Sequence, residues 1–378
     1  MVRSSNMFEN HIIIVGGGLS GLTAAYLLAR QGRSVLVIEK KAYPFHRVCG
    51  EYVSNEVKDF LVKEGLFPFE HYPASINHFR LSAVNGDQAD FPLELGGFGI
   101  SRYILDNHFY QKCLGEGVKF LQKTQVTAIQ FLPEKQHFMV ETSEGSSLPA
   151  AFVLGAYGKR SRIDKQLNRD FVQQRSPYIG VKYHIEIADQ EDHIVALHNY
   201  NGGYLGINKI ENGRFNLCYL GSREQLKATG SIGAMEEKHL FANPHIREIF
   251  KKAHFLWDRP EVINEISFAT KAPVENNILM LGDAAGMITP LCGNGMAIAI
   301  HTGKLAADAF LKHNKLADIQ QSYQKNWKAF FQSRLRLGRN VQKLFGAPVV
   351  SSLAVGLLKN SSFLSKRLIR QTHGNPIR

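Results

Sequence analysis

The chain has 378 residues, 44% of them hydrophobic and 21% charged, and its formal net charge at pH 7 is +12. This size and composition are typical of a soluble globular protein with a large core and two domains. The four cysteines are widely spaced and form no Cys-x-x-Cys pair, so neither a disulfide framework nor a metal site is predicted, and a reducing cytoplasm is favoured. No signal peptide is recognisable, and no apolar stretch approaches the ~20 residues of a membrane-spanning helix.

The first predicted strand, residues 11–15, runs directly into a glycine loop with the spacing Gly16-x-Gly18-x-x-Gly21. These glycines permit a tight turn, a close approach of the backbone to a pyrophosphate, and close packing of the next helix on the strand. That helix is predicted over residues 22–31. Its N-terminal N–H groups and the positive end of its dipole would face the phosphates.

A second strand, residues 34–38, ends at the acid Glu39, some 18 residues beyond Gly21. A carboxylate at this point can accept both hydroxyls of an adenosine ribose, and it would repel a 2′-phosphate. Strand, loop, helix, strand and acid together predict an adenine dinucleotide site, for FAD or NAD rather than NADP.

The middle of the chain is predicted to change from mixed to all-β structure. A helix is expected from Ser101 to about Leu114, followed by strands at residues 118–121, 126–129, 138–142 and 151–156. Alternating apolar and polar residues then predict an antiparallel sheet with strands at 180–187, 193–198, 203–210 and 214–220. A helix over residues 235–252 and a strand over 261–269 lead back to the first domain.

A second dinucleotide feature lies far downstream. A strand at 278–281 leads into Gly282-Asp283-Ala284-Ala285-Gly286, and Pro290, Gly293 and Gly295 precede a helix over about 296–312. An aspartate at the end of a strand can bind the ribityl chain of a flavin, and glycines that open a helix let backbone amides reach the flavin pyrimidine edge. Together the two features favour FAD.

These elements predict an α/β protein with a discontinuous cofactor domain. A Rossmann-like, three-layer FAD-binding domain is assigned to residues 1–75, 100–165 and 271–318. An interleaved α+β part, an antiparallel sheet that shapes a substrate pocket over the flavin, is assigned to residues 76–99 and 166–270. Residues 319–378 are predicted to form a basic C-terminal helical segment.

Four motifs, in this order over residues 11 to about 310, resemble the p-hydroxybenzoate hydroxylase flavoprotein superfamily and, within it, the geranylgeranyl reductase-like branch. They are the glycine loop with Glu39; Arg47-Val48-Cys49-Gly50-Glu51; Arg102-x-x-x-Asp106; and Gly282 to Gly286 with the following Pro290, Gly293 and Gly295. Gly286 stands where aromatic hydroxylases usually have histidine, and Cys49 matches a cysteine of the reductase-like branch.

The resemblance implies that Arg102 contacts the FAD pyrophosphate or ribityl region, that the backbone near Val126 meets the adenine, and that residues 47–50 lie beside the isoalloxazine. The predicted cofactor-binding residues are Gly16, Gly18, Leu19, Ser20, Gly21, Glu39, Lys40, Arg47, Val48, Gly50, Arg102, Val126, Gly282, Asp283, Gly293, Gly295 and Met296. Cys49 is the candidate catalytic residue, as a proton donor; the alternative is a small packed residue beside the cofactor.

The chain departs from its relatives at two points. Tyr157 replaces the aspartate of the usual Ala-Asp-Gly turn, which bears on cofactor or NAD(P)H handling. The segment from Tyr204 to Lys209 lacks the tryptophan and proline of the Tyr-x-Trp-x-Phe-Pro segment of prenyl reductases. It also lacks the corresponding motif of flavin halogenases, which disfavours halogenation.

Only one complete dinucleotide fingerprint is present, so NAD(P)H is predicted to act as a transient reductant of the flavin. The leading prediction is an FAD-dependent oxidoreductase that reduces C=C bonds of an isoprenoid or lipid-like, hydrophobic small molecule. One alternative is a flavin monooxygenase that hydroxylates an aromatic or polyketide compound. A second is a flavin electron carrier without substrate chemistry, although the chain has no iron-sulfur cysteines.

The excess positive charge lies at the C-terminal end, because residues 312–378 hold thirteen Lys or Arg and one acid, Asp318. Apolar and basic residues alternate there, as in an amphipathic helix that binds anionic lipid. The alternative is a helical pair packed on the cofactor domain with a solvated basic face. Nucleic acid binding is disfavoured, because the chain has no RNA- or DNA-binding motif. The chain is predicted to be cytoplasmic, with peripheral contact to the inner face of the membrane as an alternative.

Overall fold

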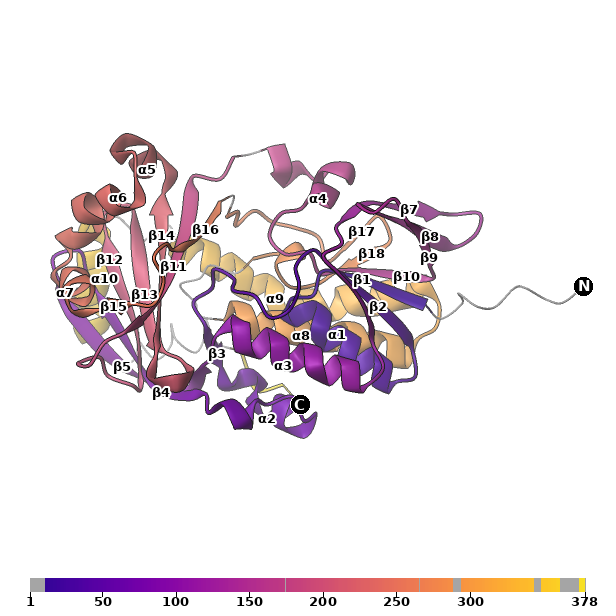
Figure 1. Ribbon diagram of the computed structural model, residues 1–378, viewed down its shortest axis with the longest axis horizontal. Helices are drawn as coiled ribbons and strands as arrows, with labels where there is room; N and C mark the ends of the chain where they lie inside the picture. The colour runs from indigo at the N-terminus through magenta and orange to yellow at the C-terminus, as the bar shows by residue number, and fades with distance from the viewer. Residues whose placement is uncertain are drawn as a thin grey trace, which may run out of the picture.

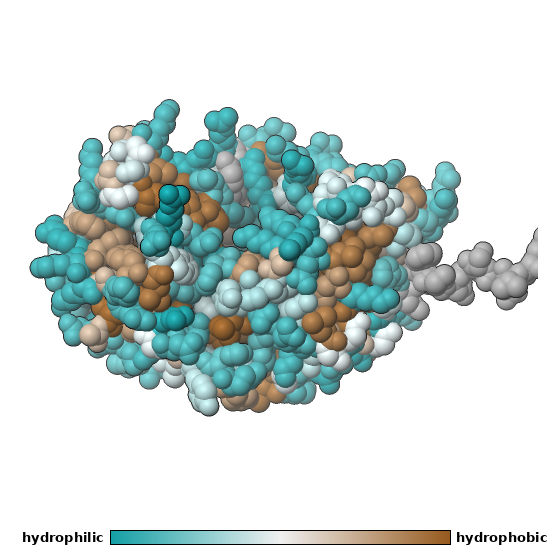
Figure 2. All heavy atoms as spheres, viewed as in Figure 1, coloured by the Kyte–Doolittle hydropathy of each residue, from teal (hydrophilic) through white to brown (hydrophobic). Residues whose placement is uncertain are grey.

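The structure, a computed structural model, describes residues 11–173, 175–264, 266–287, 294–342, 348–360 and 374–377. Two bodies, each built on a β-sheet, lie side by side, and helices α9 and α10 from the C-terminal end extend along them (Figure 1). The face of the molecule in Figure 2 is largely hydrophilic, with separate hydrophobic areas over both bodies.

The first body contains a six-stranded sheet of order β17-β18-β10-β1-β2-β6, in which every neighbouring pair except β17–β18 is parallel. Its strands are β1 (His11–Val15), β2 (Ser34–Glu39), β6 (Lys119–Gln122), β10 (Phe152–Gly155), β17 (Val274–Glu275) and β18 (Ile278–Met280). The apolar run Ile12 to Ile14 is fully buried, as expected for a central parallel strand covered on both faces.

Helices and a small sheet enclose this parallel sheet as outer layers (Figure 1). The helices are α1 (Leu19–Arg30), α3 (Arg102–Gly115) and α8 (Gly295–Lys312). The small antiparallel sheet consists of β7 (Val126–Leu132), β8 (His137–Thr142) and β9 (Ser147–Ala150). The predicted Rossmann-like, three-layer arrangement is therefore confirmed.

The second body is a nine-stranded, mainly antiparallel sheet of order β15-β11-β14-β13-β12-β4-β5-β3, with β16 paired to β11. Its strands are β3 (Tyr52–Ser54), β4 (Ala74–Ser82), β5 (Gln88–Gly99), β11 (Tyr178–Glu186), β12 (Ile194–Tyr200), β13 (Gly203–Lys209), β14 (Phe215–Ser222), β15 (His254–Phe255) and β16 (Glu261–Asn264). The strands β3, β4 and β5 were not predicted, and β3 falls within the range assigned to the cofactor domain although it pairs with β5.

The two faces of the nine-stranded sheet have different neighbours, as β11 shows. Val181, Tyr183 and Ile185 point into an apolar cluster beneath α5 (Arg223–Thr229), α6 (Ile232–His239) and α7 (Pro244–Lys252). The alternate residues Lys182 and His184 face the cofactor body, where both contact Glu51. Two-residue periodicity thus directs the polar side of this strand at the cofactor domain.

Two predicted elements are wrong in extent. The helix expected over residues 235–252 is divided into α6 and α7, because Asn243 caps α7 through its side chain and Pro244 occupies the first turn. The strand expected over 261–269 is limited to β16, since residues 266–269 belong to neither a helix nor a strand. Short elements complete the fold: α2 (Lys58–Lys63) and α4 (Arg162–Gln166).

The C-terminal segment is helical, with α9 (Leu316–Gln342) and α10 (Pro348–Asn360). Helix α9 packs along α8, and its Tyr323, Trp327 and Phe331 are buried in the core of the cofactor body. Helix α10 instead packs on β4, β5 and β12 of the nine-stranded sheet. This packing supports the helical-pair interpretation for α9; among the described helices none is long and apolar enough to cross a membrane.

Candidate functional site

The three glycines of the loop have different structural reasons to lack a side chain. A Cβ atom at Gly16, where φ is +103°, would lie 2.4 Å from the carbonyl oxygen of Ala156, and one at Gly21 would lie 2.2 Å from the oxygen of Gly16. At Gly18 the nearest heavy atom would be Nη2 of Arg102, at 3.7 Å. The fold requires the first and third glycines, whereas the second leaves an open space that suits the close approach of a pyrophosphate.

The open space at Gly18 lies at the start of α1, which begins at Leu19, earlier than predicted. Gly18 is the N-cap residue and no side chain caps the helix. Its first-turn N–H groups and dipole are therefore directed at any anion that enters. Ser20 is buried there, and its hydroxyl would lie 2.9 Å from a Cβ at Gly282, so the two glycine motifs meet at this point.

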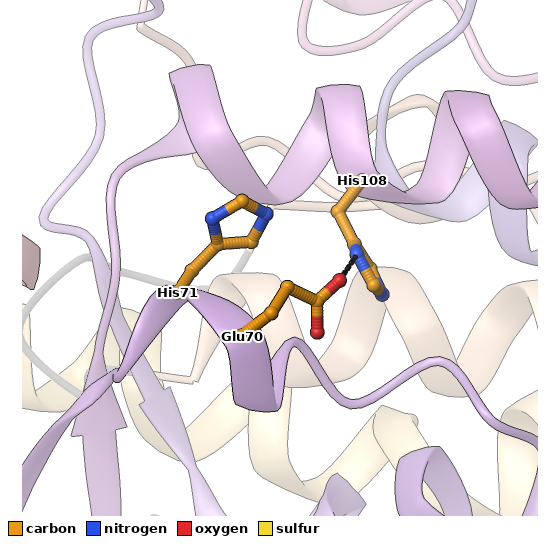
Figure 3. A group of neighbouring side chains, drawn as sticks. All are labelled: Glu70, His71 and His108. Atoms are coloured by element: carbon orange, nitrogen blue, oxygen red, sulfur yellow. Dashed lines mark ion pairs between the residues drawn. The ribbon is translucent and has the colours of Figure 1, made fainter.

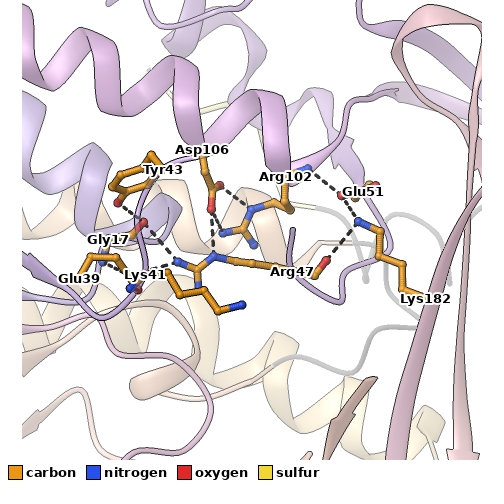
Figure 4. Close-up of polar contacts among 9 residues, drawn as sticks. All are labelled: Gly17, Glu39, Lys41, Tyr43, Arg47, Glu51, Arg102, Asp106 and Lys182. Carbon is orange, nitrogen blue, oxygen red and sulfur yellow. Dashed lines mark hydrogen bonds and ion pairs between the residues drawn. The ribbon is translucent and has the colours of Figure 1, made fainter. Parts of the chain in front are cut away.

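Glu39 is buried at the carboxyl end of β2 and faces the glycine loop (Figure 4). One carboxylate oxygen accepts a hydrogen bond from the amide of Gly17 at 2.8 Å, and the other accepts one from the amide of Lys41 at 3.1 Å. The hydroxyl of Tyr43 donates to the carbonyl oxygen of Gly17 at 2.6 Å. This orientation suits the predicted ribose contact, whereas the neighbouring Lys40 is exposed.

Asp106 in the second turn of α3 fixes two arginines beside this loop (Figure 4). It accepts two hydrogen bonds from Arg102, at 2.6 and 2.7 Å, and one from Nε of Arg47 at 3.1 Å. Arg47 also pairs with Glu39 at 3.2 Å. Both guanidinium groups thus lie at the glycine loop, although the resemblance implied that Arg47 lies beside the isoalloxazine. Asp106, which was not predicted as a site residue, positions both of them.

Glu51 is a second polar centre, fully buried between the two bodies of the protein (Figure 4). Its carboxylate pairs with Lys182, accepts a hydrogen bond from Nε2 of His184 at 2.6 Å, and accepts another from the amide of Arg102 at 2.7 Å. Burial raises the pKa of Glu51, but Lys182 and His184 outweigh burial and bring it to about 2. Because its partners come from β11 and α3, sequence spacing gave no signal for this centre.

The segment that carries Cys49 lies directly on the nine-stranded sheet. Nζ of Lys182 donates to the carbonyl oxygen of Arg47 at 3.2 Å, and Nδ2 of Asn216 donates to that of Cys49 at 3.2 Å. Burial raises the pKa of the Cys49 thiol, although the Arg102 guanidinium opposes the shift. The thiol is therefore protonated at neutral pH, which suits a proton donor better than a nucleophile.

An aromatic group that was not predicted surrounds His46. Its ring lies 4.6 Å from that of Tyr103, 4.7 Å from that of Trp257 and 5.3 Å from that of His184, measured between centroids. Burial lowers the pKa of His46 to about 4, so the ring is neutral at physiological pH. These rings lie beside the Glu51 centre, because His184 belongs to both groups.

The second glycine motif follows β18 as expected. The amide of Gly282 donates to the hydroxyl of Thr302 in α8 at 2.9 Å, and burial raises the pKa of Asp283. Nζ of Lys271 donates to the backbone oxygen of Asp283 at 2.8 Å. Gly295 and Met296 open α8, while Gly293 lies outside the described residues.

Val126, Val48 and Tyr157, three further positions discussed in the sequence analysis, lie as follows. Val126 is buried at the start of β7, close in sequence to Thr124, whose amide donates to the backbone oxygen of Glu39 at 3.2 Å. Val48 lies against β11, since a Cβ at Gly180 would be 3.3 Å from it. Tyr157, at the position of the usual aspartate, is half-buried and its hydroxyl faces the sulfur of Met280 at 3.2 Å.

An apolar cluster covers part of the sheet face that is turned toward the cofactor body. The cluster contains residues of the strands, of the two segments that flank β17 and β18, and of α10. The strands contribute Phe91, Leu197, Tyr204 and Leu220, the segments contribute Ile266 and Met287, and α10 contributes Val355 and Leu358. Met287 follows the second glycine motif directly, so the cluster, which we call the apolar wall, begins next to the predicted flavin end of the site.

The parallel sheet, the open glycine loop and the oriented Glu39 define a dinucleotide-binding flavoprotein class of fold. The family described as "FAD binding domain" matches residues 9–318, and the chain belongs to this family. It is an FAD-dependent oxidoreductase, and the predicted membership of the p-hydroxybenzoate hydroxylase superfamily is confirmed. Its distant homologues include the lipid and quinone reductases described next, as the resemblance to the geranylgeranyl reductase-like branch implies.

Curated relatives are distant. The chain is 22% identical over 320 residues to a menaquinone reductase of Mycobacterium tuberculosis, with 79% of this chain and 75% of the relative covered. It is 25% identical over 341 residues to digeranylgeranylglycerophospholipid reductase 2 of Methanosphaera stadtmanae, with 85% and 82% covered.

Solved structures share the fold. A geranylgeranyl bacteriochlorophyll reductase-like protein from Thermoplasma acidophilum has a TM-score of 0.75 at 19% identity, with 96% of this chain and 95% of that chain covered. A probable FAD-dependent monooxygenase from Pseudomonas aeruginosa has a TM-score of 0.71 at 20% identity, with 91% and 99% covered.

Proposed function

We propose that this protein reduces C=C bonds of an isoprenoid or lipid-like substrate at an FAD site. The observation that carries this proposal is the apolar wall, which runs from Met287 at the flavin end to Val355 on α10. The centre of the cluster is already buried, but Tyr178, Phe268 and Met287 at its edge are only partly buried, and there they would contact a long apolar chain beside the cofactor. Relatives named as reductases of menaquinone and of a digeranylgeranyl lipid support the same substrate class.

The residues of the site have two proposed roles: one group would bind FAD, and Cys49 would act in the reaction. Glu39 and the amides at Gly18 would bind the ribose and the pyrophosphate, and Asp106 holds Arg102 and Arg47 beside them. When bound and reduced, FAD supplies a hydride for one carbon of the double bond. Cys49 would give its thiol proton to the other carbon, which completes the saturation.

We further propose NAD(P)H as the transient source of electrons, because the chain has a single complete glycine fingerprint. The buried Glu51 centre would keep the Cys49 segment in register with the sheet, since its partners lie on β11 and α3. A neutral His46 among aromatic rings would add a surface for an uncharged part of the substrate.

A flavin monooxygenase is the second candidate. The segment that begins at Tyr204 lacks the tryptophan and proline of prenyl reductases, and Tyr204 itself is buried in the apolar wall. A wall that contains Tyr204 and Phe91 would also accept an aromatic or polyketide compound.

Oxygen dependence separates the candidates. The enzyme loaded with FAD is incubated anaerobically with NAD(P)H or dithionite and with a menaquinone or a geranylgeranylated lipid, and the product is measured by mass spectrometry. A mass increase of two hydrogens per double bond supports the reductase. Product that forms only with O2, with one added oxygen, identifies the monooxygenase, and no product under either condition favours an electron carrier.

A further inference from the structure

Three side chains of kinds that can bind a metal ion meet on the cofactor body, between a 3-10 turn and α3. Glu70 and His71 belong to a 3-10 turn over Phe69–His71, and His108 lies on α3. Figure 3 shows the three side chains pointing toward one another. One ligand atom from each of them can be chosen so that all three lie within 4.8 Å of one another.

Glu70 and His108 lie at a distance from each other that is close to the separation of two ligands on one metal ion. Oε1 of Glu70 lies 3.0 Å from Nδ1 of His108. Two ligands about 2.0–2.2 Å from a tetrahedral Zn²⁺ are themselves separated by roughly 3.4 Å. His71 is at a larger separation, with its ring centroid 5.9 Å from that of His108, so its side chain would have to move toward the ion to bind it.

His108 is buried and held in place, whereas the exposed side chain of Glu70 is free to adjust its position. Its side chain is 4% exposed, while that of Glu70 is 58% exposed. Nε2 of His108 is buried and has no hydrogen-bond partner among the described residues. In a metal complex through Nδ1, the proton of the neutral ring sits on Nε2.

We propose that Glu70, His71 and His108 form a binding site for a divalent transition-metal ion such as Zn²⁺, with water as the fourth ligand. Two imidazoles and one carboxylate are a donor set that suits Zn²⁺ and disfavours Mg²⁺ and Ca²⁺, which require oxygen ligands. The ion would link the 3-10 turn to α3. Lys112 lies one turn after His108 on α3, so its positive charge would oppose that of the ion and limit the affinity.

The test is a Zn²⁺ titration of the full-length, metal-stripped protein against a chromophoric chelator. Wild type is expected to bind one equivalent with a micromolar Kd and to melt at a higher temperature when the ion is present. Glu70→Gln and His108→Ala should each weaken binding at least tenfold, and Lys112→Gln should tighten it. Glu70 is exposed, so its variant is expected to fold even if removal of the buried His108 ring disturbs α3.

The matched control is the pair His78 and His193, whose ring centroids are 5.2 Å apart on the other body. His78→Ala should leave the Zn²⁺ affinity unchanged. Three results would overturn the proposal: no binding by wild type at millimolar Zn²⁺, binding by the Glu70 and His108 variants that is as tight as in wild type, or binding that is lost only in Cys49→Ser.

Discussion

The adenosine end and the flavin end of the proposed cofactor site are built from the chain in different ways. At the adenosine end, β1, the glycine loop, α1 and β2 follow one another without interruption, and Glu39 closes the unit on the amide of Gly17. At the flavin end, the carboxylate of Glu51 meets Lys182 and His184, more than 130 residues away. The apolar wall extends further, to Val355 on α10.

This difference predicts how an amino-acid substitution at each end would affect cofactor binding and stability. A contiguous motif owes its geometry to local backbone conformation, so a substitution there should act on the cofactor and little on the global fold. A centre assembled from distant segments holds the two bodies together, so its loss should reduce global stability. The variants below test this contrast, from the largest expected effect to the smallest.

Glu51→Gln should have the largest effect. The variant leaves the fully buried Lys182 without a charged partner, and the loss of one member of such a pair costs about 3–5 kcal/mol. Urea denaturation measures the change. Asp90→Asn is the control, because its pair with Arg80 is exposed and should contribute less than ~1 kcal/mol. Equal costs for the two variants would contradict a bridging role for Glu51.

The same centre predicts a pH dependence. The pKa of Glu51 is lowered to about 2 in the folded protein from an ordinary value of 4.5. The folded state therefore binds fewer protons, and the stabilisation by Glu51 is complete above pH 4.5 and is lost as the pH falls toward 2. The stability difference between wild type and Glu51→Gln should shrink over this range; a constant difference would exclude the mechanism.

Cys49→Ala addresses chemistry at the flavin end. If the thiol donates a proton, turnover should fall about 100-fold while FAD remains bound. Cys218→Ala is the matched control, because Cys218 is also a partly exposed free cysteine, and the turnover of this variant should stay near that of wild type. Stopped-flow measurement of flavin oxidation by substrate separates this step from binding. Wild-type rates in the Cys49 variant would leave only a packing role.

Gly18→Ala probes the adenosine end. Because a Cβ there meets no atom closer than 3.7 Å, the stability of the apoprotein should change by less than ~1 kcal/mol. The methyl group would nevertheless occupy the space of the pyrophosphate, so the Kd for FAD should rise at least tenfold. Flavin fluorescence titration measures this. Gly115→Ala, where the new Cβ also meets nothing, should change neither quantity.

The smallest structural effect is expected for the double variant Leu353→Ser/Leu357→Ser on α10. Both leucines are more than 60% exposed, so stability should change by less than ~0.5 kcal/mol. If the basic C-terminal segment contacts the membrane, binding to vesicles with anionic lipid should decrease. Leu311→Ser on α8, also exposed, is the control. Unchanged vesicle binding by the double variant would remove α10 from such a contact.

The sequence by itself determined the adenosine end of the site and the class of cofactor. Gly16, Gly18, Gly21 and Glu39 carry this information because their spacing along the chain is also their spacing in the folded loop. The strands β1, β2, β10 and β18 and the helices α1, α3 and α8 were predicted for the same reason, since apolar periodicity is a local property. The single helix predicted over residues 235–252 is wrong for an equally local reason, because Asn243 and Pro244 are a recognisable helix start.

Only the tertiary structure decided the flavin end. The sequence shows Glu51 only as the last residue of a short motif, and β11 brings Lys182 and His184 to it. The sequence also shows Asp106 in a motif with Arg102, but only the fold brings Arg47 to the same carboxylate. The aromatic face of α9 has the pattern of a lipid-binding helix, yet Trp327 packs against Gly286 in the second glycine motif. Burial of charge and apolar surface depends on partners from distant segments, and the order of residues along the chain does not specify those partners.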